Sequence, residues 1–286
     1  MTIRRVNRGR GHSYYDDGTK LDGVTTLIGD GIPKKALTLW ASGTVGEFVA
    51  ERLRKVDQDG RTTYVADEMI DDLAALSAKR GHPLGADFSR LKVAEALKYI
   101  PYAERDAAAG RGTEVHELAE RLAHGEEVEI PEAIAGHVES AVKFLDEWQA
   151  RPVLTETTVA NRRWQYAGTF DGVFDIPSLG GRYLLDWKTG GSGIYGEAAL
   201  QVSAYASAEV FLDVDGSEQD FETLGVDNET GYAVWIRSDG YDVYPLDIGP
   251  DAFKVFLHAA YVARQIGGLR DLVGQAATPP RLEAVS

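Results

Sequence analysis

The spacing of apolar residues follows a helical period over much of the first 150 residues. Helical patterns predict helices over 37–55, 67–79, 91–97, 105–124 and 131–149. The last is the clearest, because Pro131 suits a helix start and one face collects the apolar side chains of Ile134, Val138, Ala141, Val142, Leu145 and Trp148. Nearer the N-terminus, Asp17-Gly18 predicts the tight turn of a hairpin over 14–20. The segment 23–28 is either a strand or a turn into the next helix.

After residue 150 the period changes, and β-branched and aromatic residues dominate. Such segments, separated by turn residues, predict strands over 153–160, 164–176, 183–188, 231–237 and 242–246. Helices are predicted over 197–212 and 250–266, and Pro250 suits the start of the second. Helices before and after a small sheet predict an α/β or α+β fold. We expect 1–104 to form an N-terminal hairpin and helical region that packs on a core over 105–286, in one continuous structural domain.

Composition narrows the classes of function. The 286 residues are 44% hydrophobic and 26% charged, which is typical of a globular protein. The absence of cysteine excludes disulfides, thiolate zinc sites, iron–sulfur clusters and cysteine nucleophiles. No apolar run is long enough for a membrane span, and the basic start has no apolar run behind it, so we expect a cytoplasmic protein without a membrane partner.

The net charge of −15 argues against a broad basic coat for a DNA duplex but leaves a narrow basic channel open. The charge is uneven along the chain. Four arginines precede the first carboxylate, Asp16, and they either contact phosphate or belong to a frayed terminus: Arg4, Arg5, Arg8 and Arg10. The segment 213–229 carries seven carboxylates and no Lys or Arg, which predicts a solvated loop.

Two aspartates beside apolar strand residues are the clearest candidates for chemistry. Asp171 ends the run Gly168-Thr169-Phe170-Asp171, and Asp186 lies in the next predicted strand. Two converging carboxylates repel each other until a divalent cation binds between them, and Mg²⁺ accepts such ligands. Lys188 lies two residues after Asp186, so in a strand both side chains share a face. This is equipment for hydrolysing a phosphodiester. Two capping aspartates and a surface lysine are the alternative, because so short a match recurs by chance.

Other residues favour the catalytic interpretation. Gln201 and Tyr205 are separated by one helical turn and share a face. His116 follows the small residues Gly112 and Thr113, which would let its helix approach closely, and neutral imidazole is a competent metal ligand.

Four short motifs now stand in order: Gly-x-x-x-His at 112–116, Gly-x-x-Asp at 168–171, Asp-x-Lys at 186–188 and Gln-x-x-x-Tyr at 201–205. Together they resemble the RecB-type branch of the PD-(D/E)XK nucleases, which includes phage recombination exonucleases such as lambda exonuclease and the CRISPR-adaptation nucleases. The pattern His12-x-Tyr14, 24–27, Lys34 and Trp40-Ala41 is similar to the leader of phage exonucleases of this group. Some relatives hold an iron–sulfur cluster through four cysteines, which this chain lacks.

The resemblance implies a restriction-endonuclease-like core, a central mixed sheet flanked by helices, and a site that uses one or two Mg²⁺ or Mn²⁺ ions. His116, Asp171 and Asp186 would be metal ligands together with the Trp187 carbonyl. Lys188 would be the catalytic lysine. Gln201 and Tyr205 would be auxiliary site residues. Glu156 either approaches the metal through water or is a strand-surface glutamate.

The function implied is that of a free-standing, metal-dependent exonuclease acting on linear DNA in phage-type recombination or DNA processing. The candidate DNA contacts are Arg4, Arg5, Arg162 and Arg163. A single-strand annealing or recombination protein is a candidate partner, and a homo-oligomer stays open. The alternatives are a catalytically weak DNA-binding module of the same fold, an interaction protein with an acidic surface, and a zinc-dependent hydrolase using the helix with His116 and Glu120, which lacks the usual second imidazole.

Overall fold

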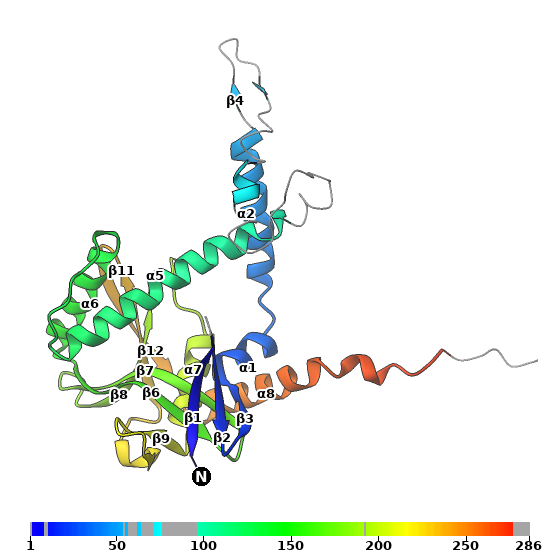
Figure 1. The fold of residues 1–286 in the computed structure, drawn as a ribbon. Helices are drawn as coiled ribbons and strands as arrows, with labels where there is room; N and C mark the ends of the chain where they lie inside the picture. The colour runs from blue at the N-terminus through cyan, green and yellow to red at the C-terminus, as the bar shows by residue number, and fades with distance from the viewer. Residues whose placement is uncertain are drawn as a thin grey trace, which may run out of the picture.

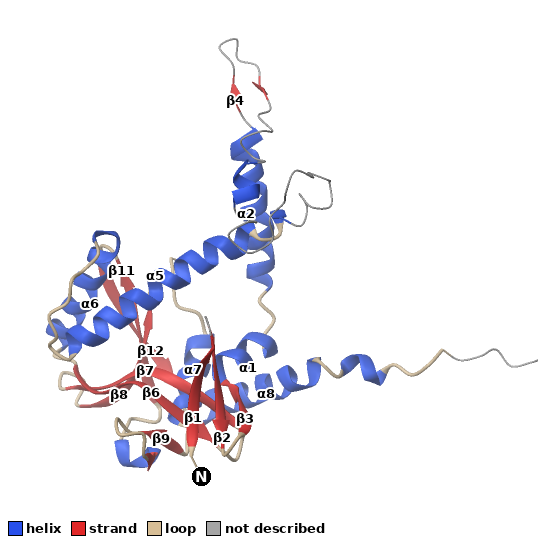
Figure 2. Ribbon diagram, in the orientation of Figure 1, coloured by secondary structure: helices blue, strands red, loops and turns tan. Residues whose placement is uncertain are grey.

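In the computed structural model, residues 2–8, 11–53, 55–56, 62–63, 71–75, 96–191 and 193–276 are described (Figure 1). Within these residues, ten strands join into one mixed sheet, and helices cover both of its faces (Figure 2). The fold is therefore α+β, as the hydrophobic pattern predicts.

The centre of the sheet comes from the segments predicted as strands. Its members are β6 (Arg151–Asn161), β7 (Tyr166–Ile176), β8 (Gly181–Lys188), β11 (Thr230–Arg237) and β12 (Gly240–Asp247). The first three strands are antiparallel neighbours, β11 runs parallel to β8, and β12 runs antiparallel to β11. A return to a parallel neighbour needs a crossover connection, and the chain between β8 and β11 contains helix α7 (Glu197–Ala206).

The N-terminal residues extend the same sheet. The strands β1 (Ile3–Arg8), β2 (Gly11–Asp16) and β3 (Thr19–Gly23) pair antiparallel in sequence, and β3 continues the sheet parallel to β7. Asp17 and Gly18 have φ angles of 45° and 85°, the positive values that a tight hairpin turn requires. Arg4, Arg5 and Arg8 thus lie in a paired strand and not in a frayed end, whereas Arg10 lies outside the described residues.

The segment 23–28 enters a helix, α1 (Val24–Gly31), rather than a strand. This helix packs closely on α8 (Pro250–Ile266). A Cβ atom on Gly31 would lie 2.1 Å from the Ala259 carbonyl oxygen, so this approach requires glycine. An eight-residue helix offers too few positions for its period to be recognised in the sequence.

Two predictions for the acidic region are wrong. The predicted helix over 197–212 ends as α7 at Ala206, and the chain then forms β9 (Val210–Leu212) at the free edge of β6. The predicted loop over 213–229 contains β10 (Glu218–Asp220) and the 3₁₀ helix η2 (Phe221–Leu224). Phe221 and Leu224 are buried, and their apolar contacts hold this segment on the core despite its seven carboxylates.

The remaining predicted helices are present where the structure describes them. They are α2 (Lys35–Leu53), α5 (Ile100–Ala123), the 3₁₀ helix η1 (Glu132–Ile134) followed by α6 (Ala135–Trp148), and α8. A helix spans 71–75, whereas the rest of 67–79 and most of 91–97 lie outside the described residues. Smaller elements are β4 (Lys55–Val56), β5 (Thr62–Thr63) and η3 (Leu269–Leu272). No described helix combines the length and apolarity needed to cross a membrane.

Two apolar layers enclose the sheet. Helices α1, α7 and α8 pack on one face, around Tyr166, Phe170 and Leu184. Helices α5 and α6 pack on the other, where Phe144 meets the edge of the Trp187 ring with centroids 5.4 Å apart. Leu184 and Leu185 point into opposite layers, as the two-residue period of a strand requires. Residues of β8 therefore contact both helical layers, and this places its C-terminal end between α5 and α7.

Candidate active site

Asp171 and Asp186 lie on adjacent strands at the C-terminal end of β8. The antiparallel register pairs Gly172 with Leu185, so the two aspartates occupy the next cross-strand position. Asp186 is 2% exposed. Burial raises the pKa of Asp186 to about 6, with nearby Lys188 acting against this shift and Asp171 adding to it. Burial likewise raises the pKa of Asp171. The structure brings together the two acids that the sequence singles out.

Lys188 faces Asp186, as the two-residue spacing predicts. Its Nζ lies 2.5 Å from Asp186 Oδ2. Burial lowers the pKa of Lys188, but Asp186 and Asp171 outweigh this effect and raise the pKa overall, so the lysine is charged. Apart from this ion pair, Asp186 Oδ2 accepts no hydrogen bond from another described residue.

His116 approaches the same acids from helix α5. Its Nδ1 lies 3.9 Å from Asp171 Oδ2, which also accepts a hydrogen bond of 2.7 Å from the Trp187 backbone N–H. Burial and the charge of Lys188 lower the pKa of His116 to about 4, so the imidazole is neutral at pH 7. A Cβ on Gly112 would lie 2.9 Å from Thr189 Oγ1, and the helix thus makes the close approach that its small residues predict.

Helix α7 supplies the opposite wall. Gln201 Nε2 lies 3.2 Å from Asp186 Oδ1 and 3.2 Å from the Tyr205 hydroxyl, to both of which it donates. A Cβ on Gly168 would lie 2.4 Å from the Tyr205 ring, so the Gly-x-x-Asp motif needs glycine where α7 crosses β7. The Gln-x-x-x-Tyr pair therefore holds one oxygen of Asp186 and leaves the other oxygen to face Lys188.

Glu156 on β6 lies opposite Asp171. The register pairs Thr155 with Gly172 and Thr157 with Phe170, and Glu156 between them adopts a φ of 44°. This left-handed conformation is uncommon for a residue other than glycine. Burial, followed by the charges of Asp171 and Glu120, raises the pKa of Glu156 to about 7, and Arg5 opposes this shift. Glu156 is thus electrostatically coupled to the acid pair.

Glu120 is engaged away from His116. Thr155 Oγ1 donates a hydrogen bond of 2.5 Å to Glu120 Oε1, and His124 Nε2 lies 3.1 Å from the same Thr155 hydroxyl. The two side chains that would bind zinc in a zinc-dependent hydrolase therefore contact different partners: His116 approaches Asp171, whereas Glu120 accepts a hydrogen bond from Thr155 of β6.

The four arginines expected to contact DNA are in different surroundings. Arg5 Nη1 lies 3.8 Å from Glu156 Oε2, at the rim of the acid pair. Arg162 forms close hydrogen bonds with Asp16 and Glu218. Arg163 stacks on the Trp164 ring at 5.3 Å and Arg4 on the Tyr15 ring at 5.7 Å. Because two carboxylates hold Arg162, this side chain is not a free cation for phosphate.

Tyr14 and Thr169 also lie at this rim, although their sequence motifs did not predict a role for them in the site. The Tyr14 hydroxyl lies 2.9 Å from Thr169 Oγ1, and Arg5 Nη1 lies 3.5 Å from the same oxygen. Thr169 precedes Asp171 by two positions, so strand alternation could have indicated that both side chains share a face. The convergence with Tyr14 required the contact between β2 and β7, which no local pattern encodes.

The donor set fits a divalent cation. It contains two carboxylates whose ionised forms burial disfavours, a buried carboxylate oxygen whose partner is the Lys188 ammonium, and a neutral imidazole. As the side chains stand, no group of three or more His, Asp or Glu among the described residues has the geometry of a metal site.

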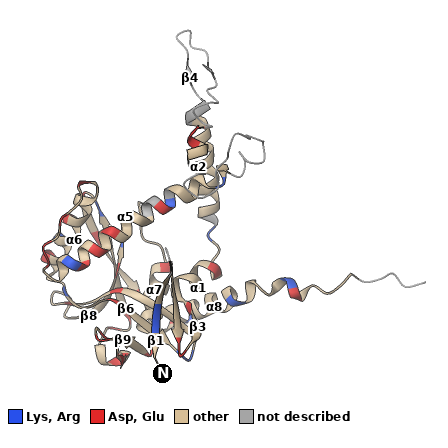
Figure 3. Cartoon of the chain, viewed as in Figure 1, with Lys and Arg blue, Asp and Glu red and all other residues tan. Residues whose placement is uncertain are grey.

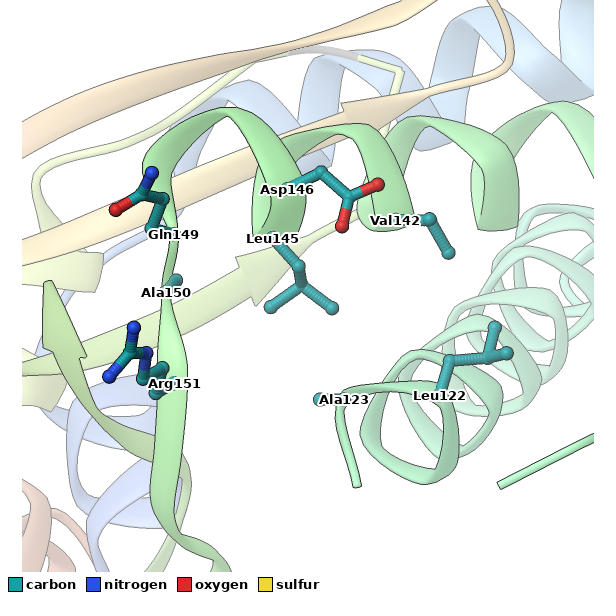
Figure 4. A pocket seen from close by; sticks show the side chains of 8 residues that line it. All are labelled: Leu122, Ala123, Val142, Leu145, Asp146, Gln149, Ala150 and Arg151. Atoms are coloured by element: carbon teal, nitrogen blue, oxygen red, sulfur yellow. The ribbon is translucent and has the colours of Figure 1, made fainter. Parts of the chain in front are cut away.

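Two hollows among the described residues lie beside this cluster. The cavity in Figure 4 has a volume of about 370 Å³ and lies between α5 and α6, lined by Leu122, Leu145, Arg151 and neighbouring residues. A larger groove of about 550 Å³ follows α5 and β6, and both Glu120 and Glu156 line it. Asp171 and Asp186 do not line this second groove, but Glu156, which does, is electrostatically coupled to Asp171.

Comparisons with known proteins add little. No protein-family model matches the chain, and a search of curated proteins found no match. Among solved structures, the chain is similar to one described as "Crystal structure of SSO0001", at 15% identity over 56% of this chain and 70% of the other, with a TM-score of 0.29. A similarity this low carries no argument about function.

Proposed function

We propose that the protein is a metal-dependent nuclease that hydrolyses phosphodiester bonds of DNA, using Mg²⁺ or Mn²⁺. The observation that carries the proposal is the acid pair: two cross-strand aspartates with raised pKa values, one of which has a buried oxygen facing a charged lysine. A structural role would be served by neutralised or fully hydrogen-bonded groups. Repelling carboxylates beside a lysine are instead equipment for binding a cation and a phosphate together.

In this proposal His116, Asp171, Asp186 and the Trp187 carbonyl hold the cation, which when bound lowers the pKa of water and neutralises phosphate charge. Lys188 then contacts the attacking water or a phosphate oxygen. Gln201 and Tyr205 fix Asp186 in place from α7. Glu156 is an outer acid that reaches the site through water.

The arrangement of strands and helices is compatible with the RecB-type PD-(D/E)XK nucleases that the sequence motifs resemble. The strand order β6-β7-β8-β11-β12, with α5 and α6 on one face and α7 on the other, agrees with the helix-flanked mixed sheet that the sequence resemblance implies. We therefore propose a restriction-endonuclease-like core and exonuclease action on linear DNA, as in phage-type recombination, with an annealing or recombination protein as partner.

The experiment is digestion of linear duplex, single strand and closed circle, with the linear substrates labelled at the 5′ or the 3′ end, in Mg²⁺ and in Mn²⁺. We expect linear DNA to be degraded and closed circles to resist. Asp186→Ala protein should be inactive yet folded. Rapid linearisation of circles would contradict the exonuclease proposal, and metal-independent cleavage would contradict the site.

A further inference from the structure

We infer that Arg5 and Thr169 form a phosphate-binding subsite beside Asp171, which contacts a phosphodiester next to the one that is cleaved. This inference rests on the proposed function and assigns the substrate contact that it leaves open. The N-terminal hairpin then acts as a substrate-binding element of the sheet.

Arg5 and the basic residues Arg4 and Lys20 lie on opposite faces of the N-terminal strands. The register pairs Arg5 with Tyr14 and Tyr14 with Leu21, so these three side chains share one face. Tyr14 is 3% exposed and Leu21 4%, which places this face against the protein. Arg4 and Lys20, both paired with Tyr15, lie on the opposite, exposed face. Strand β1, whose basic residues appear in blue in Figure 3, therefore directs only alternate side chains toward the site.

The Thr169 hydroxyl is held in place by its neighbours. Tyr14 Oη lies 2.9 Å away and Arg5 Nη1 3.5 Å away, while Thr158 Oγ1 is also at 3.5 Å. A hydroxyl has one donor and two acceptor sites. Either hydroxyl of the Tyr14–Thr169 pair can donate; when Tyr14 donates, as Arg5 does, the Thr169 O–H is left to donate, and its contact with Thr158 is long. A phosphate oxygen would be a better acceptor.

Arg5 also has donors to spare. Guanidinium carries five N–H donors in a fork that matches phosphate. In the structure Arg5 makes the long contact with Thr169 and an ion pair of 3.8 Å with Glu156, whose side chain is 44% exposed. Exposed pairs of this length stabilise a protein little. An incoming phosphate can therefore replace Glu156 as the partner of Arg5 without the loss of a strong interaction.

The charges around the acid pair explain why a cation is needed there. The carboxylates of Asp171, Asp186 and Glu156 would repel a phosphodiester that approaches the cluster. Thr169 lies two strand residues from Asp171, about 6.6 Å along β7. One DNA strand can thus contact Arg5 with one phosphate while the next reaches the acid pair.

The test compares wild type with Arg5→Ala, Arg5→Lys, Thr169→Val and, as the matched control, Lys20→Ala, which removes one positive charge from the other face of the same hairpin. Cleavage of end-labelled linear duplex in Mg²⁺ gives KM and kcat, and fluorescence anisotropy at several salt concentrations gives the salt dependence of binding. Thermal melting checks that each variant is folded.

For Arg5→Ala we expect KM to rise about ten- to hundredfold with little change in kcat, and the slope of log affinity against log salt to fall by about one. Arg5→Lys should restore the slope but only part of KM, because lysine lacks the fork. Thr169→Val should raise KM about three- to tenfold with the slope unchanged. Lys20→Ala should keep the wild-type KM.

Equal KM values and salt slopes for Arg5→Ala and Lys20→Ala, in a wild-type protein that cleaves DNA, would overturn the subsite alone. A wild-type protein that neither binds nor cleaves DNA in Mg²⁺ or Mn²⁺ would overturn the proposed function and this inference together.

Discussion

Two ionic clusters lie on the same sheet, and their charges are compensated in opposite ways. Around Arg162, Asp16 and Glu218 both accept close hydrogen bonds, and the guanidinium lowers the pKa of Asp16. Around Asp186, burial raises the pKa, and the oxygen that Gln201 does not contact faces the Lys188 ammonium at 2.5 Å. The first cluster thus favours the ionised carboxylate, whereas burial in the second disfavours it. We propose that a bound cation offsets this cost in the second cluster, and this difference would separate a functional site from a structural one.

The ion pairs of Arg162 connect segments that lie far apart in the sequence. Arg162 lies in the turn between β6 and β7, Asp16 ends β2, and Glu218 begins β10. Glu218 Oε1 accepts a further hydrogen bond of 2.6 Å from the Ile3 backbone N–H. The cluster therefore ties three distant parts of the sheet together and fixes the hairpin that carries Arg5.

The largest expected effects are on cleavage and come from the acid-pair cluster. Lys188→Ala should lower kcat by about 100-fold or more, and added metal should not restore the rate, because the proposed metal ligands remain in place.

His116→Ala should weaken metal binding about 10- to 100-fold, with a greater loss of activity in Mg²⁺ than in Mn²⁺ and partial rescue at high metal concentration. Initial rates at a series of metal concentrations measure both. An equal fractional loss at every concentration for His116→Ala would remove this histidine from the metal site.

Arg162→Ala should give the reverse pattern. The substitution leaves two partly buried carboxylates without their partner, and we expect the free energy of unfolding to fall by about 1–3 kcal/mol. Cleavage per folded molecule should be retained, because Arg162 does not contact the acid pair. Urea denaturation and the cleavage rate are measured on the same preparation. Loss of DNA binding with unchanged stability would instead support the original expectation that Arg162 contacts DNA.

The smallest expected effect is on how the free energy of unfolding depends on pH. Arg162 holds the pKa of Asp16 below its ordinary value of 3.8, so the stabilisation is complete above that value and is lost as the pH falls through the lower, folded-state pKa. Asp16→Asn should therefore reduce stability by less than about 1 kcal/mol at neutral pH, and the difference from wild type should vanish in acid. Urea denaturation between pH 3 and pH 7 tests the sign. A difference that grows in acid would contradict the assignment.

Sequence patterns predicted the elements whose periods are long and regular, such as the helix over 131–149 and the central strands. They missed β9, β10 and η2, because two apolar residues, Phe221 and Leu224, decide the placement of a segment that is otherwise acidic. In the site, the spacing of Asp186 and Lys188 sufficed to predict a shared face. The partners of Arg162 and Thr169 could not be predicted, because Glu218 and Tyr14 are 56 and 155 residues away in the chain.

We propose that a divalent cation completes the acid pair, which then cleaves phosphodiesters. Asp186→Asn keeps the size of the side chain and an oxygen for Gln201, but removes the charge. The most direct test measures the Mg²⁺-dependent cleavage rate of linear duplex together with the melting temperature, for this variant and for wild type. We predict a rate at least about 100-fold lower in a protein that still melts cooperatively, because the substitution removes one cation ligand and keeps the shape of the side chain. A folded Asp186→Asn protein that cleaves DNA at the wild-type rate would contradict the claim.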